Sequence, residues 1–333
     1  MAAGSKTWPE GTANTLTAIK VALGDMADNI YMAESKTAVL RPNPALIRGF
    51  QQAKTGQIPS LTMDGLGTYD KTKGYPAGST TLTWQDYTLA YDRARSFDLD
   101  AVDIMQEAGQ LEAGYVLSEF MRQKVVPEID ALAMSAIAQR VISAQGTVNS
   151  TSHKGNNIEY SYTPVAATFI SKIVEALNTV RDKTGIEDGY HIFVNGAYRA
   201  IIESSTEVQK IKDVGQLSGV DTRTPRISGQ DIIWMPEARM YANFTLKDGV
   251  TDGQTAGGFA PAATNPLKLA FIITAPDAAM CINAYQATKV IGSADNQTAD
   301  GTRVMFRSYF DTIVPDNKRD GCYACIVDAK PTS

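Results

Sequence analysis

The fold of this chain is decided by residues 96–140, which read SFDLDAVDIMQEAGQLEAGYVLSEFMRQKVVPEIDALAMSAIAQR. The apolar positions that recur at helical spacing are Ile104, Leu111, Tyr115, Phe120, Ile129, Ala133, Ala136 and Ile137. Pro127 lies inside this pattern, lacks a backbone donor and crowds the carbonyl of Gln123, so we expect a kink or a break there. An unbroken helix of about 40 residues would extend about 60 Å. The stretch therefore predicts one long spine helix that acts as a strut across a broad molecule.

The composition is that of a folded globular chain. Of the 333 residues, 44% are hydrophobic and 20% are charged, and the formal net charge is −5. A negative net charge argues against a protein whose main role is to bind the phosphates of nucleic acids. The N-terminus lacks a secretory signal, and no apolar run reaches the ~18 residues that span a membrane. We therefore expect no membrane partner and folding in a cytoplasm.

The first 90 residues read as projections with little core of their own. Residues 1–48 look like an arm, with helical spacing from Thr15 to Met32, which packs either on another subunit or on its own domain. Residues 49–90 predict a long β-hairpin with a Gly-rich tip, rising over 58–63 and returning over 80–89. A hairpin so poor in apolar residues is marginal alone, so we expect it to lie on a neighbouring molecule.

Residues 87–99 alternate in the manner of a strand, with Arg93 and Arg95 on the apolar face. Two arginines in that position need acidic partners or an interface. Local pairing with Asp98, Asp100 or Asp103 and contact with another subunit both remain open. The spine helix follows this strand.

The second half of the chain predicts an α/β or α+β domain followed by a terminal hairpin. Helical spacing from Pro164 ends at Gly185. A short buried strand is expected at 190–194, and further strands at 230–236 and 267–274. We expect 302–314 and 322–328 to form a hairpin that closes a sheet against the spine helix.

No pattern in the sequence indicates catalysis, a cofactor or a metal site. His153 and His191 are isolated, and phosphate-loop, nucleophile-elbow and zinc-protease motifs are missing. Cys322 and Cys325 have CxxC spacing, but no second pair or nearby histidine accompanies them. We interpret them as small apolar strand residues and predict a protein that is not an enzyme.

Three segments carry a resemblance to a known family. They are YDRARSFDLDAVD (91–103), PEIDA (127–131) and RSYFDTIVPDN (307–317), set in the order arm, Gly-rich hairpin, spine helix, α/β domain and closing strands. In this order and context the chain resembles, over nearly its whole length, the major capsid proteins of tailed bacteriophages. Encapsulins and the capsid floor proteins of herpesviruses share that fold.

The resemblance implies an α+β capsid fold with four parts. These are an N-terminal arm (1–48), an extended β-hairpin loop (49–90), a peripheral domain with the spine helix (91–150 and 281–333), and an axial α/β domain (151–280).

The implied function is that of a structural major capsid protein. Hexamers and pentamers would self-assemble in the host bacterial cytoplasm into an icosahedral virion shell around double-stranded DNA, without sequence-specific DNA binding. The implied partners are a separate scaffolding protein, a portal and a decoration protein. Some family members cross-link the loop to a neighbour through Lys and Asn. The candidate interface residues are Arg93, Arg95, Lys71, Lys73 and Asn317.

Two alternatives stay open at this point. An encapsulin-type bacterial compartment shares the fold and encloses cargo enzymes instead of DNA. An unrelated soluble enzyme would be a monomer or small oligomer with a ligand pocket.

Overall fold

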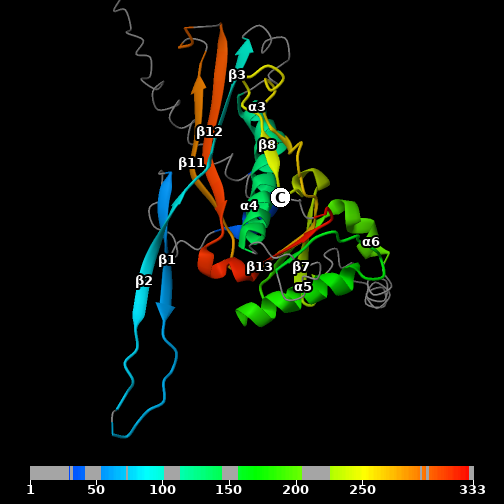
Figure 1. Cartoon of the computed structure of the whole chain (residues 1–333). Helices are drawn as coiled ribbons and strands as arrows, with labels where there is room; N and C mark the ends of the chain where they lie inside the picture. Colours follow the sequence, from blue (N-terminus) through cyan, green and yellow to red (C-terminus); the bar gives the residue numbers. More distant parts are fainter. Residues whose placement is uncertain are drawn as a thin grey trace, which may run out of the picture. The chain divides into compact units, whose positions relative to one another are not determined.

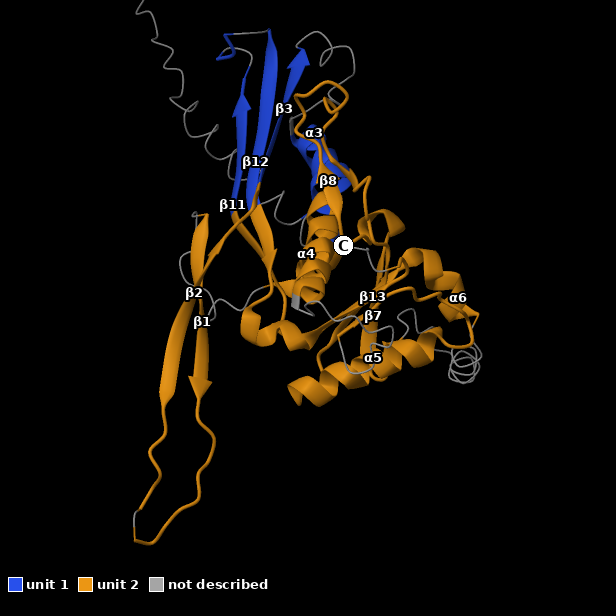
Figure 2. Ribbon diagram, viewed as in Figure 1, with its two compact units in different colours: residues 1–35, 92–126, 285–309 blue, residues 36–91, 127–284, 310–333 orange. Residues whose placement is uncertain are grey.

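The computed structural model describes residues 30, 33–41, 54–72, 74–100, 113–144, 157–204, 226–292, 295–297 and 300–329. The expected arm helix over 15–32 lies almost wholly outside these residues. The chain divides into two compact units, coloured separately in Figure 2. Unit 1 comprises residues 1–35, 92–126 and 285–309, and unit 2 comprises residues 36–91, 127–284 and 310–333.

Unit 2 is built around a six-stranded mixed sheet (Figure 1). Its strands, in spatial order, are β4 (Ile158–Glu159), β13 (Cys322–Ile326), β10 (Leu269–Thr274), β5 (His191–Asn195), β7 (Gln230–Met235) and β6 (Arg226–Ile227). β10 pairs antiparallel with both β13 and β5, whereas β4 and β7 are added in parallel. Every residue of β10 and β13 is buried, as expected for uninterrupted apolar strands covered on both faces.

Helix α5 (Phe169–Thr184) packs against β13 and β10 through one apolar stripe. Phe169 lies 6.0 Å from Phe271 of β10, measured between ring centroids. The helix ends at Gly185, whose left-handed φ of 67° a residue with a Cβ rarely adopts. The predicted helix and its glycine stop are therefore confirmed, although the helix begins a few residues after Pro164.

The remaining short elements of unit 2 connect the strands. They are the 3-10 helices η1 (Lys36–Leu40), η4 (Gly196–Tyr198), η5 (Glu237–Arg239) and η6 (Asp316–Gly321), helix α6 (Arg199–Glu203), and the paired strands β8 (Phe244–Leu246) and β9 (Phe259–Pro261). Asn195 caps η4 by accepting a hydrogen bond from the amide of Ala197. None of the helices in the described part of the chain is long and apolar enough to cross a lipid bilayer.

The spine helix is present but differs from the prediction at both the start and the proline. Residues 96–100 belong to strand β3, and 101–112 lie outside the described residues. Helix α3 (Ala113–Phe120) continues through a π-helical segment, η3 (Met121–Val125), into α4 (Val126–Ala144). The amide of Val126 bonds to the carbonyl of Met121, five residues back. The wider π turn immediately before Pro127 keeps the chain helical, so of the two expected outcomes, a kink or a break, the break is wrong.

A three-stranded sheet has the order β11 (Met280–Ile291), β12 (Gly301–Ile313), β3 (Tyr91–Asp100). The predicted terminal hairpin is wrong, because β12 and β13 belong to different sheets. Over most of its length β12 alternates between buried and partly exposed positions, whereas β13 is buried throughout. The 3-10 helix η6 connects β12 to β13, which lies between β4 and β10 in the six-stranded sheet.

The predicted hairpin is confirmed as β1 (Thr55–Met63) and β2 (Thr80–Thr88), paired antiparallel over nine residue pairs. β2 ends two residues before β3 begins, so the single strand expected over 87–99 is divided in two. The hairpin forms its own two-stranded sheet.

Candidate functional site

One face of the β1–β2 hairpin carries an apolar stripe, which we define as Pro59, Leu61, Met63, Leu82 and Trp84. Leu61 lies opposite Leu82, and Pro59 opposite Trp84. Leu61 and Leu82 are each 54% exposed, and Met63 is 65% exposed. The other face is polar, with Ser60 opposite Thr83 and Thr62 opposite Thr81. The hairpin is therefore amphipathic, and three residues of its stripe, Leu61, Met63 and Leu82, are exposed.

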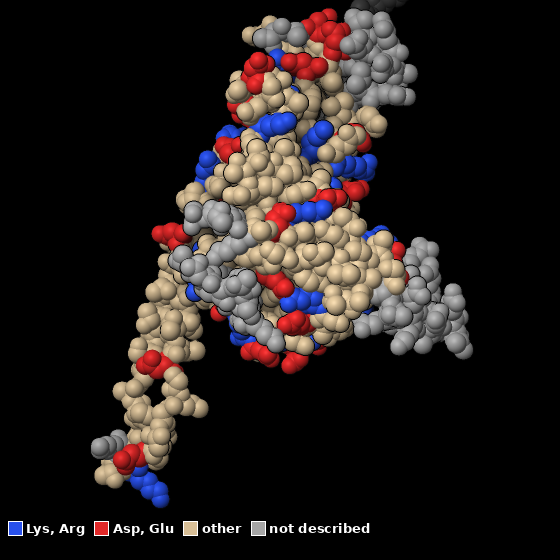
Figure 3. Space-filling view, turned by 45° about the vertical axis from the view of Figure 1, so that its right-hand side comes forward, with Lys and Arg blue, Asp and Glu red and all other residues tan. Residues whose placement is uncertain are grey.

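The stripe ends toward the foot of the hairpin at a carboxylate. Asp86 lies two residues beyond Trp84 on the same face and accepts a hydrogen bond from Gln57 across the strands at 2.7 Å. Asp86 is exposed and forms no ion pair with a described residue. The space-filling view shows few charged side chains along the hairpin away from its tip (Figure 3).

The tip of the hairpin is held by local hydrogen bonds. The amide of Ser79 donates to the carboxylate of Asp64 at 2.7 Å, and the amide of Gly74 donates to the carbonyl of Asp70 at 2.8 Å. Lys71 is exposed here, and Lys73 lies outside the described residues. Tyr69 and Tyr75 are exposed and pack their rings 5.2 Å apart.

In unit 1, one face of the three-stranded sheet is covered and the other is open. Phe120 of α3 lies 4.9 Å from Phe97 and 5.9 Å from Phe306, measured between ring centroids. The opposite face bears two cross-strand ion pairs. Arg307 bonds Asp92 through two nitrogens at 3.0 and 3.1 Å, and Arg303 bonds Asp98 in the same two-pronged way.

The open face has a hollow of about 360 Å³. It is lined by Ala94, Arg95, Ser96, Tyr285, Ala287, Lys289, Met305, Phe306 and Arg307. By strand alternation the side chains of Arg95 and Phe306 point to the other face and contribute backbone only. Small side chains form the floor, because Ala94, Ser96 and Ala287 are surrounded by larger neighbours. Lys289 at the rim is exposed and has no ion-pair partner among the described residues.

The structure describes four of the five predicted interface residues, because Lys73 lies outside the described residues. Arg93 and Arg95 lie half-buried on the covered face of β3, and both have partners within the chain. The predicted pairing with Asp98 is wrong, because that carboxylate binds Arg303 of β12. Asn317 is exposed in η6, and no hydrogen bond joins it to Lys71 within the described chain.

Asp130 is a buried anchor that sequence reasoning missed. It is fully buried on α4 and accepts hydrogen bonds from the amides of Lys36 and Thr37 at 3.2 Å and from the Thr37 hydroxyl at 2.7 Å. Arg239 adds an ion pair at 2.9 Å. The carboxylate therefore ties η1, at the end of the expected arm, to α4 and η5. The available signal was a lone Asp in the apolar run IDALAMSAIA.

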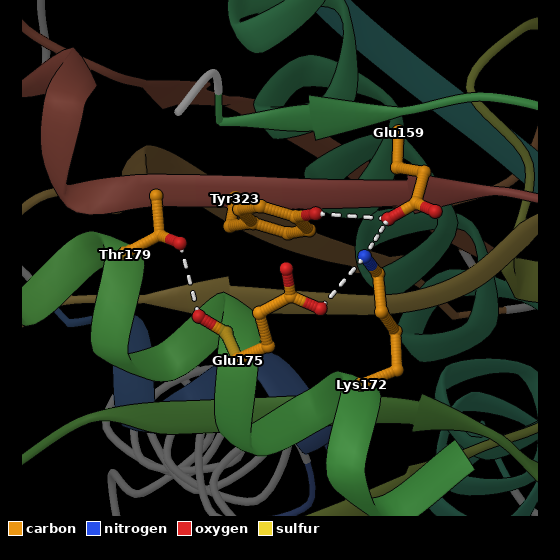
Figure 4. A network of polar contacts seen from close by, with 5 residues as sticks. All are labelled: Glu159, Lys172, Glu175, Thr179 and Tyr323. Carbon is orange, nitrogen blue, oxygen red and sulfur yellow. Dashed lines mark hydrogen bonds and ion pairs between the residues drawn. The ribbon is translucent and has the colours of Figure 1, made fainter. Parts of the chain in front are cut away.

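A second polar network joins α5 to the edge of the six-stranded sheet (Figure 4). The Lys172 ammonium lies 2.5 Å from Glu159 and 3.1 Å from Glu175, and the Tyr323 hydroxyl donates to Glu159 at 3.3 Å. Burial opposes the charge on Lys172, but hydrogen bonds to the two carboxylates raise its pKa above the usual value. Burial, together with nearby Cys325 and Glu159, raises the pKa of Tyr323. A lysine held protonated between two carboxylates is a structural link and not a nucleophile.

The comparisons with known proteins identify the fold. No protein-family model matches the chain, and no curated protein sequence matches it. A capsid structure of the cyanophage P-SCSP1u is similar at 11% identity, with a TM-score of 0.57, over 85% of this chain and 86% of that one. The mature capsid of bacteriophage PhiM1 is similar at 14% identity, with a TM-score of 0.52, over 85% of each chain.

Mycobacterium phage Che8 gives a third match at 14% identity, with a TM-score of 0.52, covering 82% of this chain and 84% of that one. All three matches cover more than four-fifths of the chain at identities of 11–14%. The chain therefore has the major capsid protein fold of the tailed bacteriophages.

Proposed function

We propose that this chain is the major capsid protein of a tailed bacteriophage, a structural tile without enzymatic activity. Copies assemble as hexamers and pentamers into an icosahedral shell around double-stranded DNA. The observation that carries the proposal is the exposed apolar stripe of the β1–β2 hairpin, in a chain with a capsid fold. Two exposed leucines on a two-stranded ribbon are unfavourable in an isolated subunit, whereas a neighbouring copy that covers them turns the same residues into a source of assembly energy.

The four parts expected from the sequence serve distinct roles in this proposal. The arm (1–48) and the extended loop (49–90) reach neighbouring copies. The peripheral domain (91–150 and 281–333) forms the rim of each capsomer, and the axial domain (151–280) meets its copies at the centre. A scaffolding protein, a portal and a decoration protein complete the particle in the bacterial cytoplasm.

The net charge of −5 supports a shell that does not grip its DNA. Packaged DNA carries its own counterions, and a protein that neutralised phosphates would present basic surface instead. Contact with the DNA is then independent of base sequence.

Assembly of the purified recombinant chain tests the proposal. Light scattering and negative-stain electron microscopy should show closed shells, tubes or hexamer sheets. The double variant Leu61→Ser/Leu82→Ser should raise the concentration needed for assembly by more than tenfold, because fully burying a leucine contributes about 1.5–3 kcal/mol.

The matched control is Thr62→Ser/Thr81→Ser, which alters an opposed pair on the polar face of the same strands. It should assemble like the wild type. A wild-type chain that stays monomeric or dimeric, even with a scaffolding protein present, would contradict the proposal. Shells that enclose cargo enzymes in place of DNA would reassign the chain to the encapsulin-type compartments.

The candidate cross-link is part of the same proposal. A bond between Lys71 or Lys73 of one copy and Asn317 of another would replace the amide nitrogen of Asn317 with the lysine nitrogen and release ammonia. Denaturing gels of assembled shells should then show a ladder of covalent oligomers, which Asn317→Ala abolishes. A single monomer band from mature shells would exclude the bond and leave the shell function intact.

A further inference from the structure

The β1–β2 hairpin is joined to β3 by a linker of two residues, Leu89 and Ala90. The side chain of Leu89 is buried, and its amide donates to the carbonyl of Lys54 at 2.7 Å. The amide of Ala90 donates to the carboxylate of Asp311 on β12 at 2.9 Å, across 221 positions of sequence. The return strand of the hairpin is therefore held at its foot by one buried side chain and by one distant carboxylate.

Asp311 is a poor position for a negative charge. Its other oxygen accepts a hydrogen bond from the amide of Thr312 at 2.7 Å, and no lysine, arginine or histidine of the described chain forms an ion pair with it. The titratable group beside it is Tyr91, whose ring stacks on Phe310 at 5.7 Å. Burial, and to a smaller extent the Asp311 carboxylate, raises the pKa of Tyr91, so this neighbour stays neutral.

The neighbouring carboxylates of β3 are neutralised in a way that Asp311 is not. Asp92 bonds Arg307 and Asp98 bonds Arg303, both across to β12. Burial raises the pKa of Asp311, although the amides of Ala90 and Thr312 act in the opposite direction. An asparagine could accept the same amide without the cost of a buried charge, so the property that a carboxylate adds here is a dependence on pH.

The direction of this dependence follows from linkage. When the linker moves away from Asp311, water reaches the carboxylate and its pKa returns toward the ordinary value of ~3.9. The closed linker therefore binds a proton more tightly than the opened linker does. Closure is favoured below the raised pKa, and this advantage is lost as the pH rises through it. Each unit by which the two pKa values differ changes the closing equilibrium about tenfold.

We propose that Asp311 is a pH-sensitive anchor of the hairpin, at which proton uptake tightens the Leu89–Ala90 linker and proton release loosens it. The neutral carboxyl keeps one oxygen that accepts the amide of Ala90, without the charge that burial opposes. The anchor acts within a single subunit, so this inference goes beyond the proposed shell function and does not depend on it.

Amide hydrogen exchange of the unassembled full-length subunit tests the anchor. Protection of the Ala90 amide, corrected for the intrinsic pH dependence of exchange, should rise at least about threefold as the pH falls from about 7 to about 4.5. Asp311→Asn, which stays uncharged and keeps one acceptor oxygen, should abolish this rise. Asp86→Asn removes an exposed carboxylate from the same hairpin and should retain the rise.

The amide of Gly185, which donates to the carbonyl of Arg181 in the same unit, is the internal control and should show no such trend. If Asp311→Asn does not fold, the carboxyl carbon shift of Asp311 in the wild type decides, because it should titrate above ~3.9 with the same midpoint as the Ala90 protection.

Three results would overturn the inference: Ala90 protection that is flat or falls toward acid pH, an Asn variant that retains the wild-type rise, or two midpoints that differ. A chain that forms no shell would refute the proposed function and leave the exchange result unaffected.

Discussion

At the scale of single residues, Asp130 is a buried polar anchor of unit 2. Its carboxylate has no solvent exposure and serves two backbone amides, a hydroxyl and Arg239. A buried carboxylate is tolerated only when its hydrogen bonds are satisfied, and here the donors come from two separate segments, η1 and η5. The residue therefore couples the end of the arm to the spine helix.

Asp130→Ala should lower the free energy of unfolding of the unassembled subunit by about 3–5 kcal/mol. The substitution leaves the buried amide and hydroxyl of Thr37 without an acceptor and removes the counter-charge of Arg239. Urea denaturation followed by circular dichroism measures this change. The control is Asp231→Ala, which breaks the exposed Arg226–Asp231 pair and should change stability by less than about 1 kcal/mol. Equal effects of the two variants would show that Asp130 is not an anchor.

Because the thiol of Cys322 is buried, we expect the free energy of unfolding to fall at alkaline pH. Burial raises its pKa to about 12, whereas an unfolded cysteine titrates near ~8.5. Below about pH 8.5 both states keep the proton. At higher pH the unfolded chain releases a proton that the folded chain retains, so the free energy of unfolding falls by about 1.4 kcal/mol per pH unit for this group.

Cys322→Ala lacks this group, so its stability should fall less steeply than that of the wild type as the pH rises from about 9 to about 11. Chemical denaturation at a series of pH values measures both slopes. Parallel curves for the two proteins would refute the assignment.

The residue scale also shows where sequence reasoning stops. Arg93 and Arg95 stood out correctly as arginines on a half-buried face, but Asp98, one of the three carboxylates considered as their partners, pairs elsewhere. The carboxylates of that segment pair with Arg303 and Arg307, more than 200 positions away. The spacing of residues within one segment does not show which distant segment pairs with it. For the same reason the partners of Asp130 could not be predicted.

At the scale of elements, Gly301 marks the close approach of β12 to β3. A Cβ at this position would overlap the carbonyl oxygen of Leu99, and it would lie 3.1 Å from the Cα of Asp100. Gly301→Ala should therefore cost about 1–3 kcal/mol of stability through overpacking of the backbone. Thermal unfolding of the unassembled subunit measures it.

Gly292, just beyond β11, provides the matched control. It has no positive φ, and a Cβ there would meet nothing within 4 Å. Gly292→Ala should change stability by no more than about 0.5 kcal/mol. If both substitutions were equally well tolerated, β12 would not approach β3 closely at Gly301.

Elements with a strong local pattern were predictable, and their partners were not. The β1–β2 hairpin, α5 with its glycine stop, and the buried strands β5, β7 and β10 follow from apolar runs and turn residues. β12 and β13 were wrongly joined because a short connection favours a hairpin. Their patterns already differed, since β12 alternates and CYACI does not, and only a strand buried on both faces can lie inside a covered sheet.

At the scale of the whole molecule, the fold is shared with phage capsids at 11–14% identity, so it rests on the order of elements more than on particular residues. That order was readable in the sequence. The assembly surfaces were only partly readable, because an exposed stripe and a shallow hollow depend on which strand faces remain uncovered.

The central claim is that copies of this chain build a closed shell in which the hairpin of each copy is covered by a neighbour. Cryo-electron microscopy of particles assembled from the purified chain tests it most directly. The account predicts an icosahedral reconstruction of hexamers and pentamers, with the Leu61 and Leu82 face of the hairpin buried on an adjacent copy. Particles in which that face points to solvent, or a preparation that contains only monomers and dimers, would contradict it.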